Sequence, residues 1–256
     1  MSTQVLADIV EVGRRLYARG LISGNEGNIS VREGEHLLIT PAGVCKGFLR
    51  PEQIVRTDLE GRPVEGGGRA STEVLMHLAV YRRRPDVQAV VHAHPPTATG
   101  FAVSRIPLDR PLIAEAVVTL GPVPVIPYGT PSTPELAEGV GRAACEAHGL
   151  LLANHGALTV GDTLFRAWER METLEQLARV ALVTRTLGQD NLLPPADVER
   201  LRQMRAAAGY PAPVCVDCPS CGQSVSLTGG DPVVLSRDEL VRLVWEGVER
   251  FSSADA

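Results

Sequence analysis

The sequence predicts an α/β or α+β domain over residues 1–208, and three observations support this fold class. Short β-type runs are interspersed with segments of helical periodicity, as in domains that pack helices against a sheet. Hydrophobic residues make up 44% of the 256 residues, which is enough for an ordinary core. No internal repeat is visible, and the length sets a prior of one to two domains.

The first half of this domain is expected to begin with a helix and to continue into strands. Residues 5–19 carry apolar side chains at helical spacing and end at Gly20, which predicts an amphipathic helix. Three β-type runs follow, at residues 27–32, 36–40 and 54–58. The Gly-rich stretch 65–69 is expected to be a loop. A second helix should begin with Ser71 or Thr72 as its N-cap and end at Arg84, because Pro85 cannot continue it.

The second half alternates strands with helices. Buried strands are predicted at residues 87–94 and 149–156, and the Pro-rich stretch 122–129 fits an edge strand. A helix should start at Pro134, because proline is favoured in the first turn. Residues 163–187 contain no Pro or Gly and repeat apolar residues every three or four positions, which predicts one long helix.

Composition argues against several kinds of partner and location. A net charge of -5 and an aromatic content of 4% do not suit a nucleic-acid platform. No segment approaches the roughly 20 apolar residues of a membrane span. The first fifteen residues lack a basic stretch followed by an apolar run, so no secretory signal is expected and the expected compartment is cytoplasmic.

Three histidines stand at the ends of predicted strands. His92 and His94 are two positions apart, so a strand would present both imidazoles on one face. His155 follows another apolar run and precedes a glycine. Three imidazoles would suit a catalytic zinc with an open coordination position. The plain alternative is ordinary surface or loop histidines, because spacing alone does not bring His155 to the other two.

Glu73 lies at the start of the predicted second helix. A carboxylate there would take part in the reaction of an active site, or it would simply complement the positive end of the helix dipole. His77 lies one turn later on the same face and is expected to be a packed core histidine. We therefore keep His77 outside the predicted ligand set.

Five ordered stretches resemble the class II aldolase/adducin family. They are GNEGNISVR, LLITPAGVCKG, RASTEVLMH, AVVHAHPPTATGFAV and LLLANHGALTVG, spread over about residues 1–190. The resemblance implies a class II aldolase-like fold, three-layer α/β/α with a mixed central sheet. It also implies a homotetramer with active sites between subunits.

The same resemblance assigns roles to the polar residues. It makes His92, His94 and His155 the ligands of one Zn²⁺ per subunit, and it makes Glu73 the catalytic carboxylate. This chain resembles the aldolase branch of the family in carrying glutamate at position 73. The epimerase branch typically carries aspartate there. Non-enzymatic adducin heads lack the metal histidines, so the resemblance favours an enzyme.

The family's phosphate-binding loops match four residues of this chain: Asn28, Gly43, Ser71 and Thr72. Small residues and donors beside a helix N-terminus suit phosphate oxygens, although turn chemistry accounts for the Gly and Asn residues nearly as well. The chain departs from the family at Asn25 and Ala42, where relatives carry hydroxyl groups. Glu26 adds a carboxylate that would repel phosphate unless it points away.

The implied activity is a zinc-dependent aldolase acting on a phosphorylated sugar. It would cleave a ketose 1-phosphate, fuculose-1-phosphate or a related deoxy ketose phosphate, to dihydroxyacetone phosphate and an aldehyde. A tyrosine from a neighbouring subunit is expected to act as the acid, and Tyr210 is the candidate. The alternatives are a metal-dependent dehydratase or decarboxylase of a sugar-acid or thiosugar phosphate, and a non-catalytic adducin-like interaction module.

The five cysteines leave several interpretations open. An odd count is typical of a reduced compartment, and Cys45 and Cys145 are expected to be buried small apolar residues. Cys215, Cys218 and Cys221 form CxxCxxC in a Gly, Pro and Cys-rich linker, residues 209–235. They would be reduced thiols, ligands of a metal or intersubunit site, or redox groups.

The chain is predicted to end in an amphipathic helix over residues 236–251. Ser236 and Glu239 form a capping box, and one side of the helix is apolar. Such a short helix needs a partner in water. The partner would be its own or a neighbouring subunit, or a shell protein, since the segment resembles encapsulation peptides of bacterial microcompartments. The second alternative would place the protein inside such a compartment.

Overall fold

The computed structural model describes residues 3–65 and 68–216. Its strands are β1 (Asn28–Glu33), β2 (His36–Ile39), β3 (Val55–Asp58), β4 (Pro63–Glu65), β5 (Ala89–Ala93), β6 (Val125–Ile126), β7 (Gly149–Leu152) and β8 (Gly156–Gly161). Its α-helices are α1 (Thr3–Ala18), α2 (Val74–Arg83), α3 (Pro96–Val103), α4 (Ala114–Thr119), α5 (Pro134–Ala143), α6 (Leu164–Leu187) and α7 (Pro195–Ala207). Two short 3-10 helices are η1 (Lys46–Phe48) and η2 (Pro51–Gln53).

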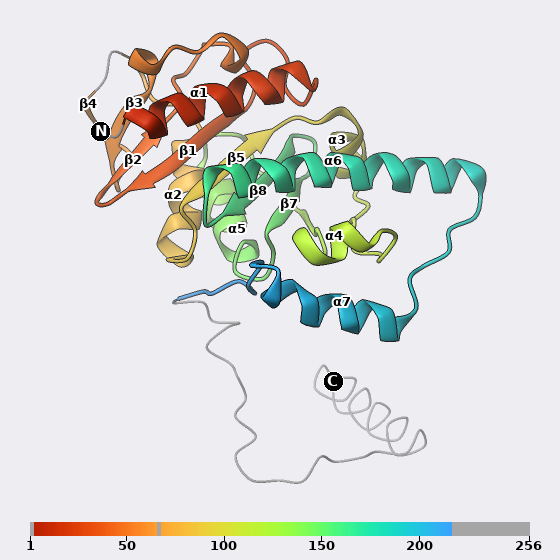
Figure 1. The fold of residues 1–256 in the computed structure, drawn as a ribbon. Coiled ribbons are helices and arrows are strands. Elements are labelled where there is room, and N and C mark those ends of the chain that lie inside the picture. The colour runs from red at the N-terminus through yellow and green to blue at the C-terminus, as the bar shows by residue number, and fades with distance from the viewer. Residues whose placement is uncertain (1–2, 66–67, 217–256) are drawn as a thin grey trace, which may run out of the picture. The chain divides into compact units, whose positions relative to one another are not determined.

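The strands form one mixed sheet with helices on both faces (Figure 1). Their order is β4-β3-β2-β1-β5-β8-β7-β6, and only the pairing of β6 with β7 is parallel. Helices α1, α3, α4 and α6 share one hydrophobic core with one face of the sheet. Helices α2 and α5 share a second core with the other face. The expected three-layer α/β/α fold with a mixed sheet is confirmed.

Strand β5 shows how one strand serves both cores. Val91 packs into the core beneath α6, whereas its neighbour Val90 packs into the core beneath α2. Alternate residues of a strand point to opposite faces, so a strand buried on both sides becomes a continuous apolar run. All five residues of β5 are buried, and this centre of the sheet carries the histidines.

The strongly periodic helices are confirmed. The α5 helix has Pro134 in its first turn and Thr133 as its N-cap, and α6 begins after the N-cap Thr163. The α2 helix begins at Val74, later than expected, because the chain makes a turn at Ser71–Glu73 before it becomes helical. The sequence did not predict α3, α4, α7 and β4.

The predicted single strand over residues 149–156 is wrong in its second half. Strand β7 ends at Leu152, a turn follows, and β8 runs back antiparallel from Gly156. Asn154 makes this turn possible because it adopts the left-handed region, with φ of 55°, which asparagine tolerates better than most residues. His155 therefore lies in a turn between two strands.

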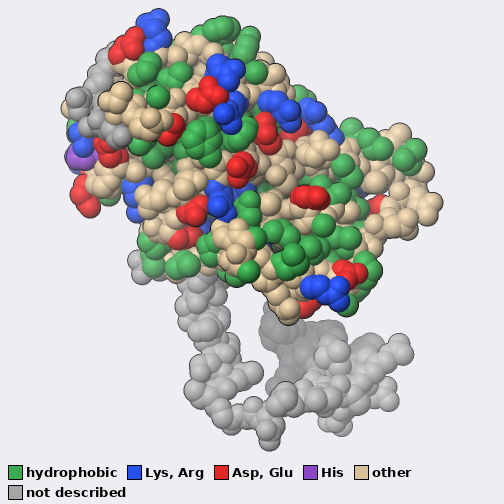
Figure 2. All heavy atoms as spheres, in the orientation of Figure 1, with side chains coloured by type: hydrophobic (Ala, Val, Ile, Leu, Met, Phe, Trp, Pro, Cys, Tyr) green, Lys and Arg blue, Asp and Glu red, His purple; other side chains and the backbone are tan. Residues whose placement is uncertain are grey.

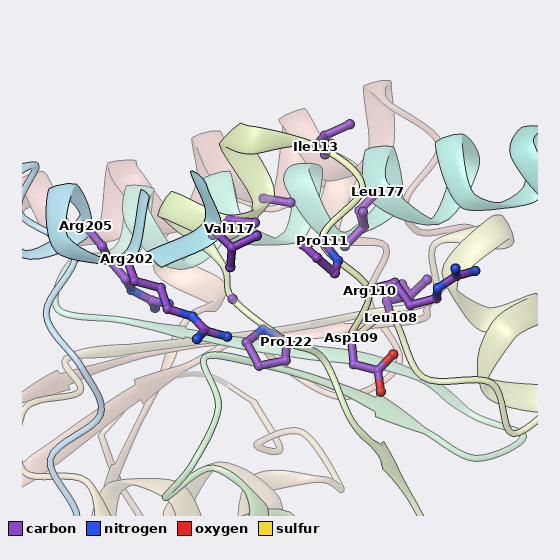
Figure 3. A pocket seen from close by; sticks show the side chains of 13 residues that line it. Leu108, Asp109, Arg110, Pro111, Ile113, Val117, Pro122, Leu177, Arg202 and Arg205 are labelled. Carbon is purple, nitrogen blue, oxygen red and sulfur yellow. The ribbon is translucent and has the colours of Figure 1, made fainter. Parts of the chain in front are cut away.

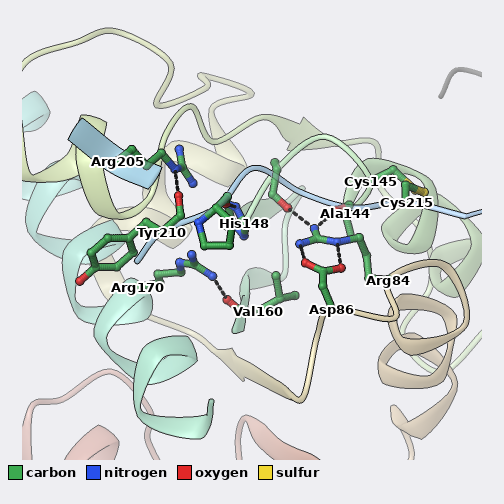
Figure 4. A network of polar contacts seen from close by, with 12 residues as sticks. Arg84, Asp86, Ala144, Cys145, His148, Val160, Arg170, Arg205, Tyr210 and Cys215 are labelled. Carbon is green, nitrogen blue, oxygen red and sulfur yellow. Dashed lines mark hydrogen bonds and ion pairs between the residues drawn. A yellow bond between two sulfur atoms is a disulfide. The ribbon is translucent and has the colours of Figure 1, made fainter. Parts of the chain in front are cut away.

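Residues 209–216, the start of the predicted linker, are bonded to the domain (Figure 4). The Tyr210 carbonyl accepts from Arg205 Nε at 3.1 Å, and the Pro211 carbonyl accepts from His148 Nε2 at 3.0 Å. The Val216 N–H donates to the Arg83 carbonyl at 2.9 Å. We call residues 209–216 the strap.

A disulfide joins Cys145 to Cys215 of the strap. This corrects the expectation that Cys145 is a free buried residue and that Cys215 is a reduced thiol or metal ligand. The two Cα atoms lie 5.1 Å apart although 70 positions separate them in sequence. Only the return of the strap to the end of α5 brings them together, so sequence spacing carried no signal of the pair.

The remaining predictions for the C-terminal part lie outside the described residues. They concern the rest of the linker, Cys218, Cys221 and the helix over 236–251. Within the described part of the chain, no helix has the length and apolar character needed to cross a membrane. On the face drawn in Figure 2, arginine and acidic side chains of the described residues are interspersed.

Candidate metal centre

The sheet register brings the three histidines together. His92 lies in β5, and His94 follows directly after its end. Ala93 of β5 pairs with Ala157 of β8, so the turn that carries His155 lies beside the end of β5. One nitrogen from each imidazole lies within 4.8 Å of the other two. The sequence spacing left open whether His155 reaches the other two histidines. The pairing of β5 with β8 brings the three together.

Gly156 allows these rings to approach. A Cβ at this position would lie 2.5 Å from the Ala93 carbonyl oxygen and 2.6 Å from His94 Cδ2. No side chain fits there without moving the strand or the ring. The glycine after His155 therefore has a packing reason, in addition to its place in a turn.

The donor set fits a divalent metal ion. His92 Nδ1 donates to the Ala157 carbonyl at 2.9 Å, which leaves the Nε2 lone pair free to bind a cation. The Nε2 atoms of His92 and His94 are 3.1 Å apart. Two nitrogens bound to one tetrahedral zinc lie about 3.3 Å apart, so little movement would be needed.

The electrostatics of His94 agree with metal binding. Burial, together with the neighbouring His92 and His155, lowers the pKa of His94 to about 4. His94 is therefore a neutral imidazole at neutral pH, which is the form that binds metal. Among the described residues, His92, His94 and His155 form the only group of three or more potential metal ligands that converge in this way.

Glu73 lies against this cluster from the start of α2. Its Oε2 is 3.3 Å from His92 Nε2, and its Oε1 is 3.1 Å from His155 Nε2. Burial raises the pKa of the Glu73 carboxyl, but His92 and His155 outweigh this effect and hold the pKa well below its usual range. The site therefore holds an ionised carboxylate next to three imidazoles.

A buried chain of hydrogen bonds holds Glu73 from behind. Asn28 Nδ2 donates to Glu73 Oε2 at 2.7 Å, so the Asn28 Oδ1 accepts from His77 Nε2. His77 Nδ1 must then accept, and Ser30 Oγ donates to it at 2.7 Å. The Tyr81 hydroxyl lies 2.9 Å from Ser30 Oγ and donates to the Ser30 carbonyl.

His77 is buried, as expected, but it is more than a packing residue. It is fully shielded from solvent, and burial lowers its pKa to about 3, so it stays neutral. One tautomer satisfies both of its neighbours, and that tautomer fixes which way the Asn28 amide faces. The only sequence signal was its position one helical turn after Glu73.

Glu175 is a residue that the sequence did not single out. Its carboxylate accepts from the backbone N–H groups of Thr97 at 3.3 Å and Ala98 at 2.9 Å. These groups belong to the first turn of α3, which begins two residues after His94. A carboxylate at this helix end satisfies free N–H groups and fixes the segment that carries His94.

The predicted phosphate-binding residues lie on two adjoining loops and β1. Gly43 takes a left-handed φ of 72° in the turn after β2, and this turn pairs with the segment before α2 through Ala42 N and the Arg69 carbonyl. Ser71 Oγ accepts from Glu73 N at 3.3 Å, and Thr72 is exposed. The Asn28 amide is engaged by Glu73 and His77.

The Glu26 carboxylate is turned toward other partners. It accepts from the Ser23 backbone N–H at 3.1 Å and from its hydroxyl at 2.9 Å. Its other oxygen is 3.7 Å from His94 Nδ1. The carboxylate that would repel phosphate is therefore engaged beside the histidines.

Tyr210 lies at the opposite end of β7 from His155. Its ring stacks on the Arg166 guanidinium, 4.2 Å from the ring centre, and Arg170 lies 5.8 Å away. Within one chain, Tyr210 thus lies in the strap, against Arg166 and Arg205, and not beside Glu73. Its expected role as an acid in a neighbouring subunit stays a prediction.

A cavity of about 130 Å³ lies between α4, α6 and α7 (Figure 3). Apolar side chains such as Leu108, Val117 and Leu177 line it, with Arg202 and Arg205 at its edge. It shares no residue with the histidine cluster. Chemistry, and not cavity size, therefore identifies the candidate site.

Comparison with known proteins finds one family along most of the chain. The family pattern described as the Class II Aldolase and Adducin N-terminal domain matches residues 7–182. A 5-deoxy-D-ribulose 1-phosphate aldolase of Bacillus thuringiensis serovar kurstaki is 33% identical over 197 residues, which are 76% of this chain and 92% of that protein.

Two further relatives carry different names. A 3-oxo-tetronate 4-phosphate decarboxylase of Haemophilus influenzae is 35% identical over 181 residues, which are 67% of this chain and 84% of that protein. The crystal structure of L-fuculose-1-phosphate aldolase from Thermus thermophilus superposes with a TM-score of 0.66 at 39% identity, covering 73% of this chain and 97% of that one.

Proposed function

Because this chain belongs to the class II aldolase and adducin family, we propose that it is a zinc-dependent aldolase acting on a ketose 1-phosphate. The relatives compared above are aldolases and a decarboxylase, and the chain is a lyase of this metal-dependent class. The observation that carries the proposal is the convergence of three imidazoles beside the ionised Glu73. A non-catalytic adducin-like module would have no use for this set.

The residues divide the chemistry between them. His92, His94 and His155 would hold the ion, whose Lewis acidity would withdraw electron density from the oxygens of the substrate. In the condensation direction, the Glu73 carboxylate would remove a proton from the hydroxyl-bearing carbon of dihydroxyacetone phosphate. That carbon would then form its bond to the aldehyde carbon, and the aldehyde oxygen would take a proton from an acid.

The hydrogen bonds around Glu73 support this role. A general base must be ionised and aimed, and Asn28 fixes one carboxylate oxygen while leaving the other toward His155. In the cleavage direction the same carboxyl would return the proton to carbon. We propose Tyr210 of a neighbouring subunit of a homotetramer as the acid for the aldehyde oxygen.

We propose fuculose-1-phosphate or a related deoxy ketose phosphate, such as a 5-deoxypentulose 1-phosphate, as the substrate. Aldolases of both types of sugar phosphate are among the relatives. A phosphorylated substrate fits the donors on the adjoining loops at Gly43, Ser71 and Thr72, with Asn28 at their base. The decarboxylase among the relatives supports decarboxylation of a sugar-acid phosphate as the alternative, with a thiosugar phosphate dehydratase as a further one.

The direct test is to measure bound metal and then to supply dihydroxyacetone phosphate with a panel of short aldehydes. We expect about one zinc per subunit and condensation with at least one aldehyde. The Glu73→Gln variant is the control. It should keep its bound metal but should not catalyse the condensation. Stoichiometric metal with carbon dioxide release from an oxo-acid phosphate, and no condensation, would support the decarboxylase alternative instead.

For residues 236–251 we propose recruitment to a bacterial microcompartment shell. The support is the sequence alone: a capping box, one apolar side and a preceding Gly and Pro-rich linker. The test is to fuse residues 230–256 to a fluorescent protein in cells that make shells. Punctate fluorescence is expected, and diffuse fluorescence would contradict the proposal.

A further inference from the structure

Lys46 is the only lysine of the chain. The sequence has 25 basic residues, and the other 24 are arginines. Arginine is a larger planar cation, whereas lysine offers a compact ammonium with three donors. Lys46 is therefore the one position of the chain with an ammonium side chain.

The Lys46 side chain is buried, and within the described part of the chain it has no ion-pair partner. Lys46 is only 3% exposed, and its Nζ donates to the Asn25 carbonyl at 2.6 Å. Among the described residues, no carboxylate forms an ion pair with it. Burial lowers its pKa from the usual value. A buried ammonium with one acceptor for three donors is costly, unless a further partner arrives.

The loop that accepts the hydrogen bond of Lys46 also passes the candidate metal centre. Asn25 belongs to the loop that passes the histidines, because a Cβ at Gly27 would lie 2.8 Å from the His92 carbonyl oxygen. The charge of Glu73 also acts on Lys46 and partly offsets the effect of burial on its pKa. Lys46 follows three residues after Gly43, in the segment that leaves the turn beside Ser71.

From these contacts we propose that Lys46 binds the phosphate group of the substrate. The other donors expected at this position are neutral: backbone N–H groups and the hydroxyls of Ser71 and Thr72. Lys46 would supply the one full positive charge, and the phosphate would supply the missing acceptors. This proposal rests on the proposed function, in that it takes a phosphorylated substrate as given.

A purely structural role for Lys46 makes a different prediction. The backbone around it is already fixed by close packing, since a Cβ at Gly13 would lie 2.4 Å from the Lys46 carbonyl oxygen. If the ammonium only anchored the Asn25 loop, its loss would destabilise the fold. If the ammonium instead serves to bind an anion, the Lys46→Met variant should fold at least as stably as the parent protein. Methionine has a similar length and removes an unpaired buried charge.

The first experiment measures binding of inorganic phosphate to the metal-loaded protein by titration calorimetry. We expect Lys46→Met to bind phosphate about tenfold to a hundredfold more weakly than the parent protein, with a melting temperature that is not lowered. Phosphate affinity equal to that of the parent would overturn the proposal. So would an equal loss of stability and of affinity in both Lys46→Met and Lys46→Gln.

The second experiment uses the single lysine directly. Reductive methylation with formaldehyde and a borohydride reagent modifies amines, and intact mass after removal of the N-terminal residues counts modification at Lys46. We expect inorganic phosphate to protect Lys46, whereas buffer without phosphate does not. Modification at the same rate with and without saturating phosphate would contradict the proposal.

A third measurement separates this proposal from the proposed function. With Lys46→Met, the KM for dihydroxyacetone phosphate should rise about tenfold or more, while turnover of unphosphorylated dihydroxyacetone should not change. Borohydride trapping of a substrate adduct on Lys46 would overturn phosphate binding, because it would indicate covalent chemistry. Phosphate binding and protection need no turnover, so they test Lys46 even if the aldolase assignment fails.

Discussion

Two histidines at opposite ends of β7 are both largely shielded from solvent, and their surroundings are opposite. His148 precedes the strand and His155 follows it, and each has a buried Nδ1 without a hydrogen-bond partner among the described residues. Near His155 lie Glu73 and two further imidazoles. Near His148 lie arginines, a backbone carbonyl and the strap (Figure 4). Neighbours, and not burial, therefore decide what a buried histidine does.

The arginine end cannot hold a cation. Burial, together with the charges of Arg170, Arg205 and Arg84, lowers the pKa of His148 to about 2. His148 is thus a neutral donor that secures the Pro211 carbonyl of the strap. The same residue type serves as a structural clamp at one end of β7 and as a candidate metal ligand at the other.

The largest expected effect comes from exchanging the two histidines for alanine in turn. His155→Ala should lose bound metal and fall to background activity, because it removes one of three converging ligands. His148→Ala should retain the metal, since it lies at the far end of the strand. Metal content by elemental analysis and aldolase turnover check both variants. Metal loss in His148→Ala would contradict the different roles assigned to the two histidines.

The second-largest effect is expected at Glu73, the carboxylate beside His155. Glu73→Gln should lower turnover by about a hundredfold to ten-thousandfold, as loss of a general base does, while metal stays bound. Glu172→Gln, which changes a carboxylate of α6 paired with Arg19, serves as the control. Unchanged turnover in Glu73→Gln would remove Glu73 from the mechanism.

A smaller effect is expected from the chain of hydrogen bonds behind Glu73. His77→Leu leaves Asn28 Oδ1 without its donor, so kcat should fall about tenfold to a hundredfold, as for other residues that orient a metal site. The KM should change little, because no substrate contact is lost. His77→Gln can still donate to Asn28 and should recover part of kcat. A change in KM alone would contradict the positioning role.

The smallest effect is on stability in acid. The pKa of His148 is about 2 in the fold and about 6.5 when unfolded, so between these values the unfolded chain binds more protons. The contribution of neutral His148 is complete above about pH 6.5, and is lost by at most about 1.4 kcal/mol per unit as the pH falls below it. His148→Gln should flatten this slope in urea unfolding measured from about pH 7 to about pH 5, and an unaltered slope would contradict it.

Local periodicity predicted those elements whose signals lie within a short stretch of sequence. The α6 helix has 24 residues without Pro or Gly, and α5 has a proline in its first turn. The α3 helix was hidden because it opens on a proline pair and contains Gly100. The turn between β7 and β8 was hidden because the residues on both sides are apolar, and only the φ of Asn154 reverses the chain.

The candidate site was predictable only in its residue types. The spacing of His92 and His94 follows from strand geometry, whereas the arrival of His155 depends on the pairing of β5 with β8. The contact of Asn28 with Glu73 joins residues 45 positions apart. Such long-range pairs leave no mark in a local pattern, and the burial of Lys46 is of the same kind.

The way the histidines are held has a consequence for the choice of metal in the cell. His92 is fixed by the Ala157 carbonyl, and the His94 backbone N–H donates to the Leu21 carbonyl at 3.1 Å. These hydrogen bonds to the sheet and to the neighbouring loop therefore help to set the ligand positions. Three imidazoles bind most first-row divalent ions, and their affinities follow a common order. For a site of this kind, ligand geometry, ligand type and metal availability together determine which ion is bound.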